Sequence, residues 1–269
     1  ALSYINATIV PTNTHYSFDH LKSLIKTTQP DVLISNINYC KYFRKKNFFK
    51  KIISTNKSKK FNFFFENLTK KKNLSNKKID TEKNFLISFS SGSTAKPKPI
   101  VFSQKTKLIR FKLMKNLYKI NHTDKVILAC PIDHSLGMRI LFLPILTGGT
   151  IVVMNKFTAK RFVNLVKKHS ITFSVLVANQ IYELTKSKSI FKNFYLKKGL
   201  VSASAKLPEI TKNKIISKNI NLYEMYGAAE IGTVASIHIN KNIKNFKSVG
   251  KVYNNKIQIK ILSNKNKFL

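Results

Sequence analysis

Short apolar segments of β character alternate with helical patterns over residues 126–225, and this regular alternation most constrains the fold. The stretches between the apolar segments carry apolar residues at helical spacing. Alternation of this kind predicts a parallel sheet with helices on both faces. The predicted strands are 126–129, 150–154, 171–177, 200–202 and 221–225, and the predicted helices are 136–146, 159–169, 180–186 and 208–217.

The segments that flank this region are less regular. At the beginning, an apolar run at 5–10, a helical pattern from Ser17 and an apolar run at 32–34 predict a strand, a helix and a parallel strand. The lysine- and asparagine-rich block that follows contains a phenylalanine-rich run at 61–65, which predicts a core strand. The tail at 248–262 predicts a hairpin of two short strands.

The chain is strongly basic, with 49 lysines and arginines against 11 acidic residues and a formal net charge of +38. This charge is expected to attract nucleotides and other anions by long-range steering. Only Arg44, Arg110, Arg139 and Arg161 are arginines, whereas proteins that bind nucleic acid usually exploit the bidentate guanidinium group. The even spread of lysines beside asparagine, isoleucine and phenylalanine favours compositional drift. A basic fragment that binds nucleic acid stays an alternative.

Cysteine use and hydrophobicity indicate a cytoplasmic protein. Cys40 and Cys130 are far apart and form no C-x-x-C pair, as expected of two buried thiols in a reducing compartment. No charged segment followed by an apolar one opens the chain, so no signal peptide is predicted. The apolar region 140–154 is interrupted by Pro144 and Gly148 and is shorter than the roughly 20 residues of a membrane span. Contact with a membrane is therefore expected to be peripheral at most.

A hydroxyl-rich segment lies between two apolar runs, 85–89 and 100–102. Its hydroxyl side chains, glycine and lysines are Ser90, Ser91, Ser93, Thr94, Gly92, Lys96 and Lys98. Short donors, a backbone that a ligand can approach closely and fixed positive charge are what a polyphosphate requires. The Walker sequence G-x-x-x-x-G-K-[ST] cannot be fitted around Gly92. The segment therefore predicts a phosphate-binding loop of another kind.

Further candidate residues follow other predicted strands. Tyr226, Gly227 and Glu230 come just after the strand at 221–225, and ligands of open α/β sheets collect beyond the carboxyl ends of strands. A tyrosine ring can pack on a purine, a glycine permits close approach, and a glutamate can hold a magnesium ion that shields a triphosphate. His134 also follows a strand, although a lone histidine is more often an ordinary surface or core residue.

These segments resemble the motifs of the adenylate-forming (AMP-binding) enzyme superfamily, and most of all those of acyl-CoA synthetases. Residues 85–103, F-L-I-S-F-S-S-G-S-T-A-K-P-K-P-I-V-F-S, resemble the signature phosphate loop, with Ala95 where a glycine is usual. Residues 226–230, Y-G-A-A-E, resemble the Y-G-x-T-E motif, with an alanine in the place of the threonine. P-I-D-H-S-L-G at 131–137 resembles the P-x-x-H-x-x-G segment that lines the acyl pocket. S-A-S-A-K-L at 202–207 occupies the position of the small-residue stretch beside the adenine.

The resemblance covers essentially the whole chain and implies the large domain of this superfamily. That domain is α/β, with mostly parallel sheets flanked by helices in two stacked αβ subdomains and the start of a small β-barrel-like region. The implied division is a partial first αβ subdomain at 1–84, a nucleotide- and acyl-binding αβ subdomain at 85–240 and a β-rich partial region at 241–269. Parts of the family architecture are expected to be missing before Ala1 and after Leu269, among them a small mobile domain. We therefore expect the chain alone to form thioesters slowly.

By this resemblance the protein is an AMP-forming acid–thiol ligase. ATP and a carboxylic acid, with a fatty acid expected, would give an acyl-adenylate and pyrophosphate. Coenzyme A or a carrier-protein thiol would then take the acyl group. The implied cofactors are ATP, Mg²⁺ and coenzyme A. Adenylation of an amino acid or aryl acid within the same superfamily stays an alternative, as does a non-catalytic remnant of the enzyme.

The resemblance also implies roles for single residues. Thr94, Lys96 and Glu230 are the expected catalytic residues, and Glu230 is the expected magnesium ligand. His134 and Gly137 are expected to contact the acyl substrate. The residues expected to bind ATP are Ser90, Ser91, Gly92, Ser93, Thr94, Ala95, Lys96, Ala203, Ser204, Ala205, Tyr226, Gly227, Ala228 and Ala229.

Overall fold

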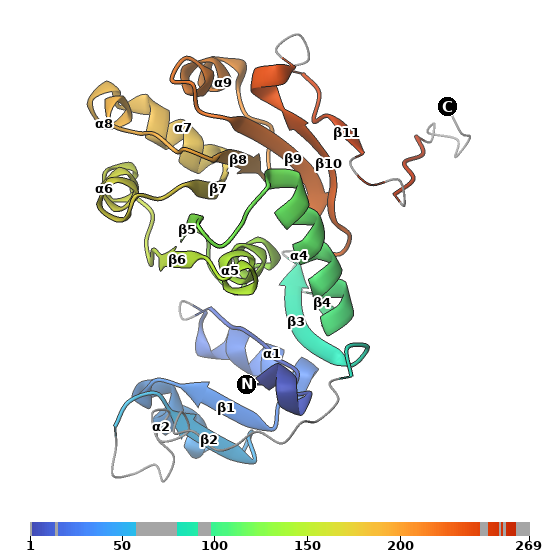
Figure 1. Cartoon of the computed structure of the whole chain (residues 1–269). Coiled ribbons are helices and arrows are strands. Elements are labelled where there is room, and N and C mark those ends of the chain that lie inside the picture. Colours follow the sequence, from blue (N-terminus) through green and yellow to red (C-terminus); the bar gives the residue numbers. More distant parts are fainter. Residues whose placement is uncertain are drawn as a thin grey trace. The chain divides into compact units, whose positions relative to one another are not determined.

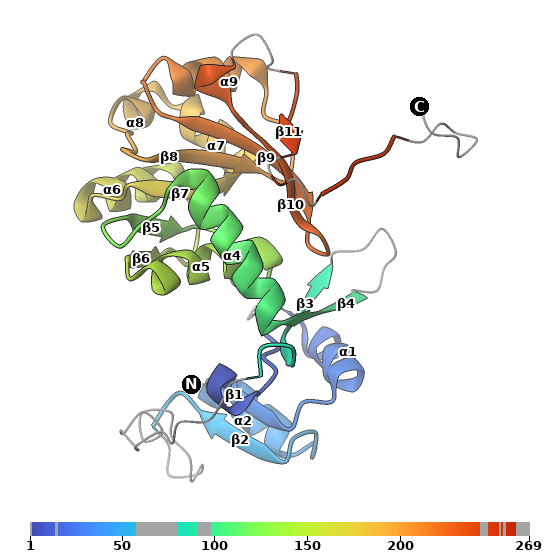
Figure 2. The same ribbon diagram turned by 45° about the vertical axis from the view of Figure 1, so that its right-hand side comes forward.

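A computed structural model of the chain, shown in Figures 1 and 2, forms two compact units, residues 1–87 and residues 88–269. The structure describes residues 2–13, 16–57, 80–90, 98–242, 247–252, 254 and 257–261. The predicted strand at 61–65 and the central part of the hydroxyl-rich segment, 91–97, lie outside these residues.

The first unit contains a small parallel sheet with its connecting helix. Its elements are η1 (Leu2–Ile5), α1 (Phe18–Thr28), β1 (Val32–Ser35), α2 (Ile37–Arg44) and β2 (Lys51–Ser54). β1 and β2 pair in parallel, and α2 connects them. Ser17 caps α1 by accepting a hydrogen bond from the backbone N–H of His20. The predictions of a helix from Ser17 and a strand at 32–34 are confirmed.

The predicted strand at 5–10 is wrong. The chain begins with the 3₁₀ helix η1, and Asn6 adopts a left-handed backbone conformation with a φ of 55°. This conformation interrupts the extended backbone that a strand needs. Within the run, Ile9 forms an isolated parallel bridge with Leu86. The crossover of this unit therefore runs from β1 through α2 to β2.

The second unit is built on a mixed sheet. Its strands are β5 (Lys125–Leu128), β6 (Thr150–Val153), β7 (Phe173–Val177), β8 (Gly199–Ala203), β9 (Leu222–Ala228), β10 (Gly232–His238) and β11 (Lys251–Val252). These seven strands follow the order β11-β10-β9-β8-β7-β5-β6. The pairs β6–β5, β5–β7, β7–β8 and β8–β9 are parallel. β10 pairs in antiparallel fashion with β9 on one side and with β11 on the other. β3 (Asn84–Ser90) and β4 (Lys98–Ser103) form a separate two-stranded sheet.

Helices cover both faces of the larger sheet. They are α4 (Gln104–Tyr118), α5 (Ser135–Thr147), α6 (Ala159–His169), α7 (Ala178–Lys186), α8 (Lys188–Lys192) and α9 (Glu209–Ile216). α4 and α5 share one buried core with the sheet, and α6 to α9 share the other (Figure 1). Successive side chains of β5 point into opposite cores. Val126 and Leu128 pack with α4 and α5, and Ile127 packs with α6 and α7. The predicted α/β fold is thereby confirmed.

Four features of the second unit depart from the sequence expectations. The sequence patterns did not indicate α4, α8 or β10. The tail does not form the predicted hairpin, because β11 pairs with β10 and residues 257–261 carry no strand. β10 offers the tail an edge with unpaired backbone groups, and the short strand β11 uses it. Among the described helices, none combines the length and the apolar character needed to cross a membrane.

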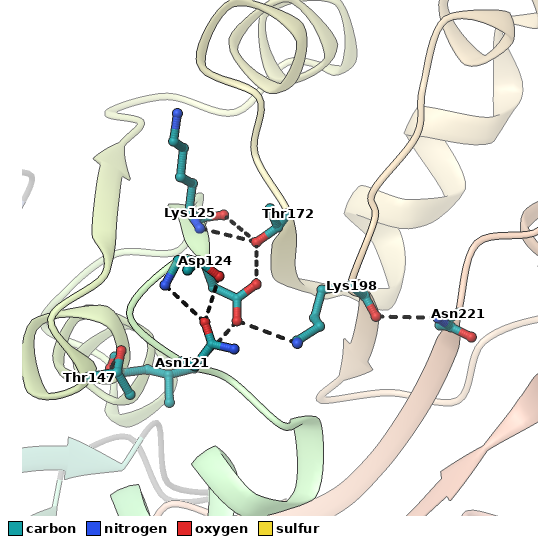
Figure 3. A network of polar contacts seen from close by, with 9 residues as sticks. Asn121, Asp124, Lys125, Thr147, Thr172, Lys198 and Asn221 are labelled. Carbon is teal, nitrogen blue, oxygen red and sulfur yellow. Dashed lines mark hydrogen bonds and ion pairs between the residues drawn. The ribbon is translucent and has the colours of Figure 1, made fainter.

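A polar network around the buried Asp124 joins the amino-terminal ends of three parallel strands, β5, β7 and β8 (Figure 3). Asp124 Oδ1 accepts a hydrogen bond from Thr172 Oγ1 at 2.8 Å, and Oδ2 accepts one from Asn121 N at 2.9 Å. The same Oδ2 lies 3.6 Å from Lys198 Nζ, and Lys125 N donates to Thr172 Oγ1 at 3.1 Å. Ligands of open α/β sheets bind at the opposite, carboxyl ends of the strands, so this network is structural.

Candidate functional site

Glu230 lies in a tight turn between β9 and β10. Ala228 pairs with Gly232, so residues 229–231 reverse the chain. A Cβ atom on Gly227 would lie 2.0 Å from the carbonyl oxygen of Gly232, and Gly232 has a φ of 81°. Both positions therefore require glycine for the turn itself, whatever else they contact. Glu230 is exposed at the turn.

Arg110 of α4 holds this turn in place. Its Nη1 donates a hydrogen bond to the carbonyl oxygen of Ala229 at 2.9 Å, and its Nη2 donates one to the carbonyl oxygen of Glu230 at 2.5 Å. The guanidinium group also lies over the Phe102 ring, 4.6 Å from its centre. Arg110 bonds to the backbone carbonyl oxygen of Glu230 and not to its side chain. These bonds therefore fix the position of Glu230 without using its carboxylate as an acceptor.

A pocket of about 410 Å³ lies between α4, the turn and the chain near Ile257. Arg139 of α5 lines it and donates from Nη1 to Thr233 Oγ1 at 2.8 Å. The polar residues that line the pocket are Thr106, Arg110, Arg139, Glu230, Thr233 and Asn254. The remaining walls are apolar and include Leu113 and Leu117. Two guanidinium groups beside apolar walls suit a molecule with an anionic head and an apolar body.

Lys107 adds a third basic group to this region. Its Nζ lies 3.8 Å from the centre of the Phe102 ring. Burial, and then the positive charges of Arg110 and Arg139, lower the pKa of the Lys107 ammonium from 10.5 to about 7. Such crowding of positive groups favours the binding of an anion nearby.

The lowered pKa of Lys107 predicts how stability depends on pH. From about pH 7 to pH 10.5 the unfolded chain binds a proton at Lys107 that the folded chain releases, so the free energy of unfolding should rise with pH. Replacing Lys107 by methionine should flatten this rise, as measured by thermal denaturation across that range. Lys112→Met, which removes an exposed lysine of the same helix, is the control. An equal flattening in both variants would contradict the prediction.

The residues expected to frame the adenine lie on neighbouring strands. Ser202 of β8 pairs with Glu224 of β9, so Ser204 and Tyr226 each follow two residues further along. Ser204 has a φ of 72°, a left-handed conformation that ends β8. Tyr226 is 57% exposed, whereas Ala203 is buried. The structure thus brings the small-residue stretch and Tyr226 together at the carboxyl end of the sheet.

His134 and Gly137 lie at the start of α5. His134 is the N-cap residue of α5 without a side-chain capping bond, and its Nε2 lies 4.0 Å from Asp133 Oδ2. Gly137 is buried, and a Cβ atom there would lie 1.9 Å from the carbonyl oxygen of Pro131. Packing alone therefore requires this glycine. Neither residue belongs to the described lining of the pocket, so their contact with an acyl group stays a prediction.

The phosphate-loop predictions fall where the structure gives no description. Ser91, Gly92, Ser93, Thr94, Ala95 and Lys96 lie outside the described residues, as does the side chain of Ser90. Their contacts with phosphate stay predictions. Within the described part of the chain, no three His, Cys, Asp or Glu side chains converge to hold a metal ion. Glu230 alone still fits Mg²⁺, because proteins often hold this ion by one or two carboxylates together with phosphate oxygens and water.

Sequence reasoning missed the two arginines of the site. Arg110 and Arg139 were noted only as part of a scarce residue type. Both contact the β9–β10 hairpin, from helices far away in the sequence. Their scarcity in a lysine-rich chain was the available signal, since arginine is retained where planar, directed hydrogen bonds are needed.

Curated proteins with similar sequences are ligases that act on coenzyme A. The chain is 27% identical over 183 residues to YhfT of Bacillus subtilis, which is named an uncharacterized acyl-CoA ligase. This alignment covers 66% of this chain and 37% of YhfT. It is 25% identical over 154 residues to the indoleacetate–CoA ligase of Aromatoleum aromaticum. That alignment covers 56% of this chain and 30% of the ligase. The chain therefore spans about a third of the length of these relatives.

Solved structures with the same fold cover almost the whole chain. The luciferase-like enzyme of the nonluminescent mealworm Zophobas morio has a TM-score of 0.83 at 19% identity, covering 99% of this chain and 65% of that protein. The N-terminal domain of FACL13 from Mycobacterium tuberculosis has a TM-score of 0.84 at 14% identity, covering 100% of this chain and 68% of that one. The family model for AMP-binding enzymes matches residues 1–268. With this match the chain belongs to the AMP-binding enzyme family.

Proposed function

We propose that this chain forms the nucleotide- and acid-binding part of an AMP-forming acid–thiol ligase. The observation that supports this most is the turn at 229–231. It presents the exposed carboxylate of Glu230, is held by Arg110, and borders a pocket with a second arginine and apolar walls. It also completes the Y-G-A-A-E segment, which begins in β9 and lies at the carboxyl end of the parallel part of the sheet.

The proposed reaction begins with two anions that must approach each other. A carboxylate oxygen attacks the α-phosphorus of ATP, the bond from this phosphorus to the pyrophosphate oxygen breaks, and an acyl-adenylate forms. A thiol, for which we propose coenzyme A, then attacks the acyl carbon and AMP leaves. Positioning and charge neutralisation dominate the first step, because the reactants repel each other in water.

The residues of the chain divide this work. Thr94, Lys96 and their neighbours in the hydroxyl-rich segment would hold the β- and γ-phosphates. Tyr226 and the stretch 203–205 would border the adenine at the end of β8 and β9. Glu230 would hold Mg²⁺, which when bound offsets part of the charge of the triphosphate. Together these groups would fix ATP with its α-phosphorus accessible to the acid.

The pocket suggests which acids fit. Its arginines suit a carboxylate, and its aliphatic and aromatic walls suit an apolar body, so we propose a fatty acid as the substrate. His134 would border the acyl group from the start of α5. Amino-acid or aryl-acid adenylation is the second candidate. A cytoplasmic location belongs to the same proposal, since Cys40 and Cys130 are both buried free thiols.

Acid-dependent exchange of labelled pyrophosphate into ATP tests the function. We expect exchange with decanoate to exceed that with phenylacetate or leucine. Exchange with leucine alone would favour amino-acid adenylation, and titration showing ATP binding without exchange for any acid would identify a non-catalytic remnant. Binding of duplex DNA with a steep salt dependence, in the absence of ATP binding, would overturn the proposal in favour of a nucleic-acid-binding protein.

The proposed phosphate loop predicts unequal effects of two lysine substitutions. Lys96→Ala should weaken ATP binding by about tenfold or more, because it removes a charge-assisted hydrogen bond to phosphate. Lys72→Ala removes the same charge from the lysine-rich block and should have little effect, apart from weak long-range attraction. Calorimetric titration with ATP at fixed ionic strength compares them. Equal losses would count against the loop.

A further inference from the structure

A lysine and a glutamate form a buried ion pair between α9 and β9, the strand that carries Tyr226. Lys212 of α9 has 0% exposure and Glu224 of β9 has 3%. Lys212 Nζ contacts Glu224 Oε2, and Glu224 Oε1 accepts a hydrogen bond from the backbone N–H of Leu207 at 3.0 Å. Burying two charges costs desolvation energy that their attraction often fails to recover. The pair therefore calls for an explanation other than stability.

Glu224 connects two elements that would contact the base. Leu207, which is fully buried, ends the loop that leaves β8 at Ser204. Glu224 precedes Tyr226 by two residues, so both side chains lie on the same face of β9. One carboxylate thereby fixes the distance between the loop and the strand that carries Tyr226.

The same residue is tied to the strand that follows the Glu230 turn. Ser236 Oγ of β10 donates a hydrogen bond to the backbone carbonyl oxygen of Glu224 at 2.9 Å. β10 begins directly after that turn. Contacts of Glu224 thus reach the loop at 204–207, the helix α9 and the hairpin of Glu230.

We propose that Glu224 is a positioning residue for the nucleotide base, held in place by Lys212. It anchors the loop at 204–207 through the Leu207 N–H, and the anchored loop forms one wall of the adenine site while Tyr226 forms the other. This inference rests on the proposed function. It adds a residue pair to which the sequence motifs assign no role.

Two double variants isolate the anchoring hydrogen bond. Lys212→Met with Glu224→Gln, and Lys212→Met with Glu224→Leu, both remove the charges and keep similar side-chain volumes. Glutamine retains an oxygen that can accept the Leu207 N–H, whereas leucine does not. Both proteins should fold, because each removes the two buried charges together and leaves neither without its partner.

The probes are magnesium ATP and magnesium tripolyphosphate, since only ATP carries a base. We expect the leucine variant to lose about five- to tenfold in ATP affinity, the size of one hydrogen bond, with tripolyphosphate affinity unchanged. The glutamine variant should stay within about threefold of the wild type for both probes. In the wild type, ATP but not tripolyphosphate should slow hydrogen exchange of the Leu207 amide, a readout that needs no variant.

The matched control is Asp124→Asn with Lys198→Met, which removes the ion pair at the amino-terminal ends of β5 and β8 in the same sheet. It should leave the ratio of ATP to tripolyphosphate affinity unchanged. Unchanged ATP affinity in the leucine variant would overturn the inference, and so would an equal loss for both probes. A wild type that binds neither probe would overturn the proposed function, whereas wild-type binding with unaltered variants would overturn the inference alone.

Discussion

Replacing Glu230 by glutamine is expected to reduce the gain in ATP affinity that magnesium provides by roughly 100-fold. The two side chains have nearly the same shape, so the substitution removes a charged oxygen ligand and little else. Arg110 bonds to the backbone of the turn, at the carbonyl oxygens of Ala229 and Glu230, and these bonds do not depend on the side chain. The thermal stability of the variant should therefore match that of the wild type.

Titration of ATP at several magnesium concentrations measures this effect, and pyrophosphate exchange provides a second readout. Glu209→Gln is the control, since Glu209 is exposed in the first turn of α9, away from the pocket lining. It removes the same charge from the same unit. If both variants lost the magnesium dependence of ATP binding equally, general electrostatics would explain the result. If Glu230→Gln kept the magnesium dependence of the wild type, Glu230 would not be the magnesium ligand.

The alternating pattern predicted the centre of the sheet well because β5, β7 and β8 are buried on both faces. Val126, Ile127 and Leu128 of β5 are all almost inaccessible, as are Leu200 and Val201 of β8. Strands of this kind appear in the sequence as continuous apolar runs, and the helices between them carry a single apolar face. The pattern and the fold therefore agree most closely between β5 and β9.

α4 escaped detection for the opposite reason, because it uses two faces. Met114 and Tyr118 belong to the core beneath the sheet and also line the pocket, and Ile109, Leu113 and Leu117 extend the apolar pocket lining along the helix. With apolar residues around most of its circumference, separated by lysines, the helix shows no single stripe at helical spacing. The helix that carries Arg110 was missed because part of its apolar surface serves the site.

The site itself was predictable only in part. The order of the hydroxyl-rich segment, the small-residue stretch and Y-G-A-A-E pointed to the carboxyl end of the sheet. The contacts that fix this site could not be predicted, since Arg110 and the turn it holds are 119 and 120 residues apart in the sequence. The buried partners Lys212 and Glu224 were equally hidden, because a charged residue in a helix or strand is ordinarily expected on the surface.

Lys212→Met alone is expected to destabilise the protein by about 3–5 kcal/mol, because it leaves the carboxylate of Glu224 buried without its cation. Adding Glu224→Leu should recover most of this loss, since the double variant buries neither charge. Lys198→Met breaks the pair with Asp124, but Lys198 is 29% exposed and Asp124 keeps two other hydrogen-bond donors. It should therefore cost about 1 kcal/mol or less.

Urea denaturation of the wild type, the single variants and the double variant completes this comparison. A midpoint that falls sharply for Lys212→Met and returns in the double variant means that the cost comes from the unpaired carboxylate. The same large loss in the double variant would instead mean that the cost comes from other contacts of the Lys212 ammonium, because methionine keeps a similar side-chain volume. In that case Glu224 would owe its orientation to Leu207 and the strand alone, and Lys212 would have no part in holding the adenine loop.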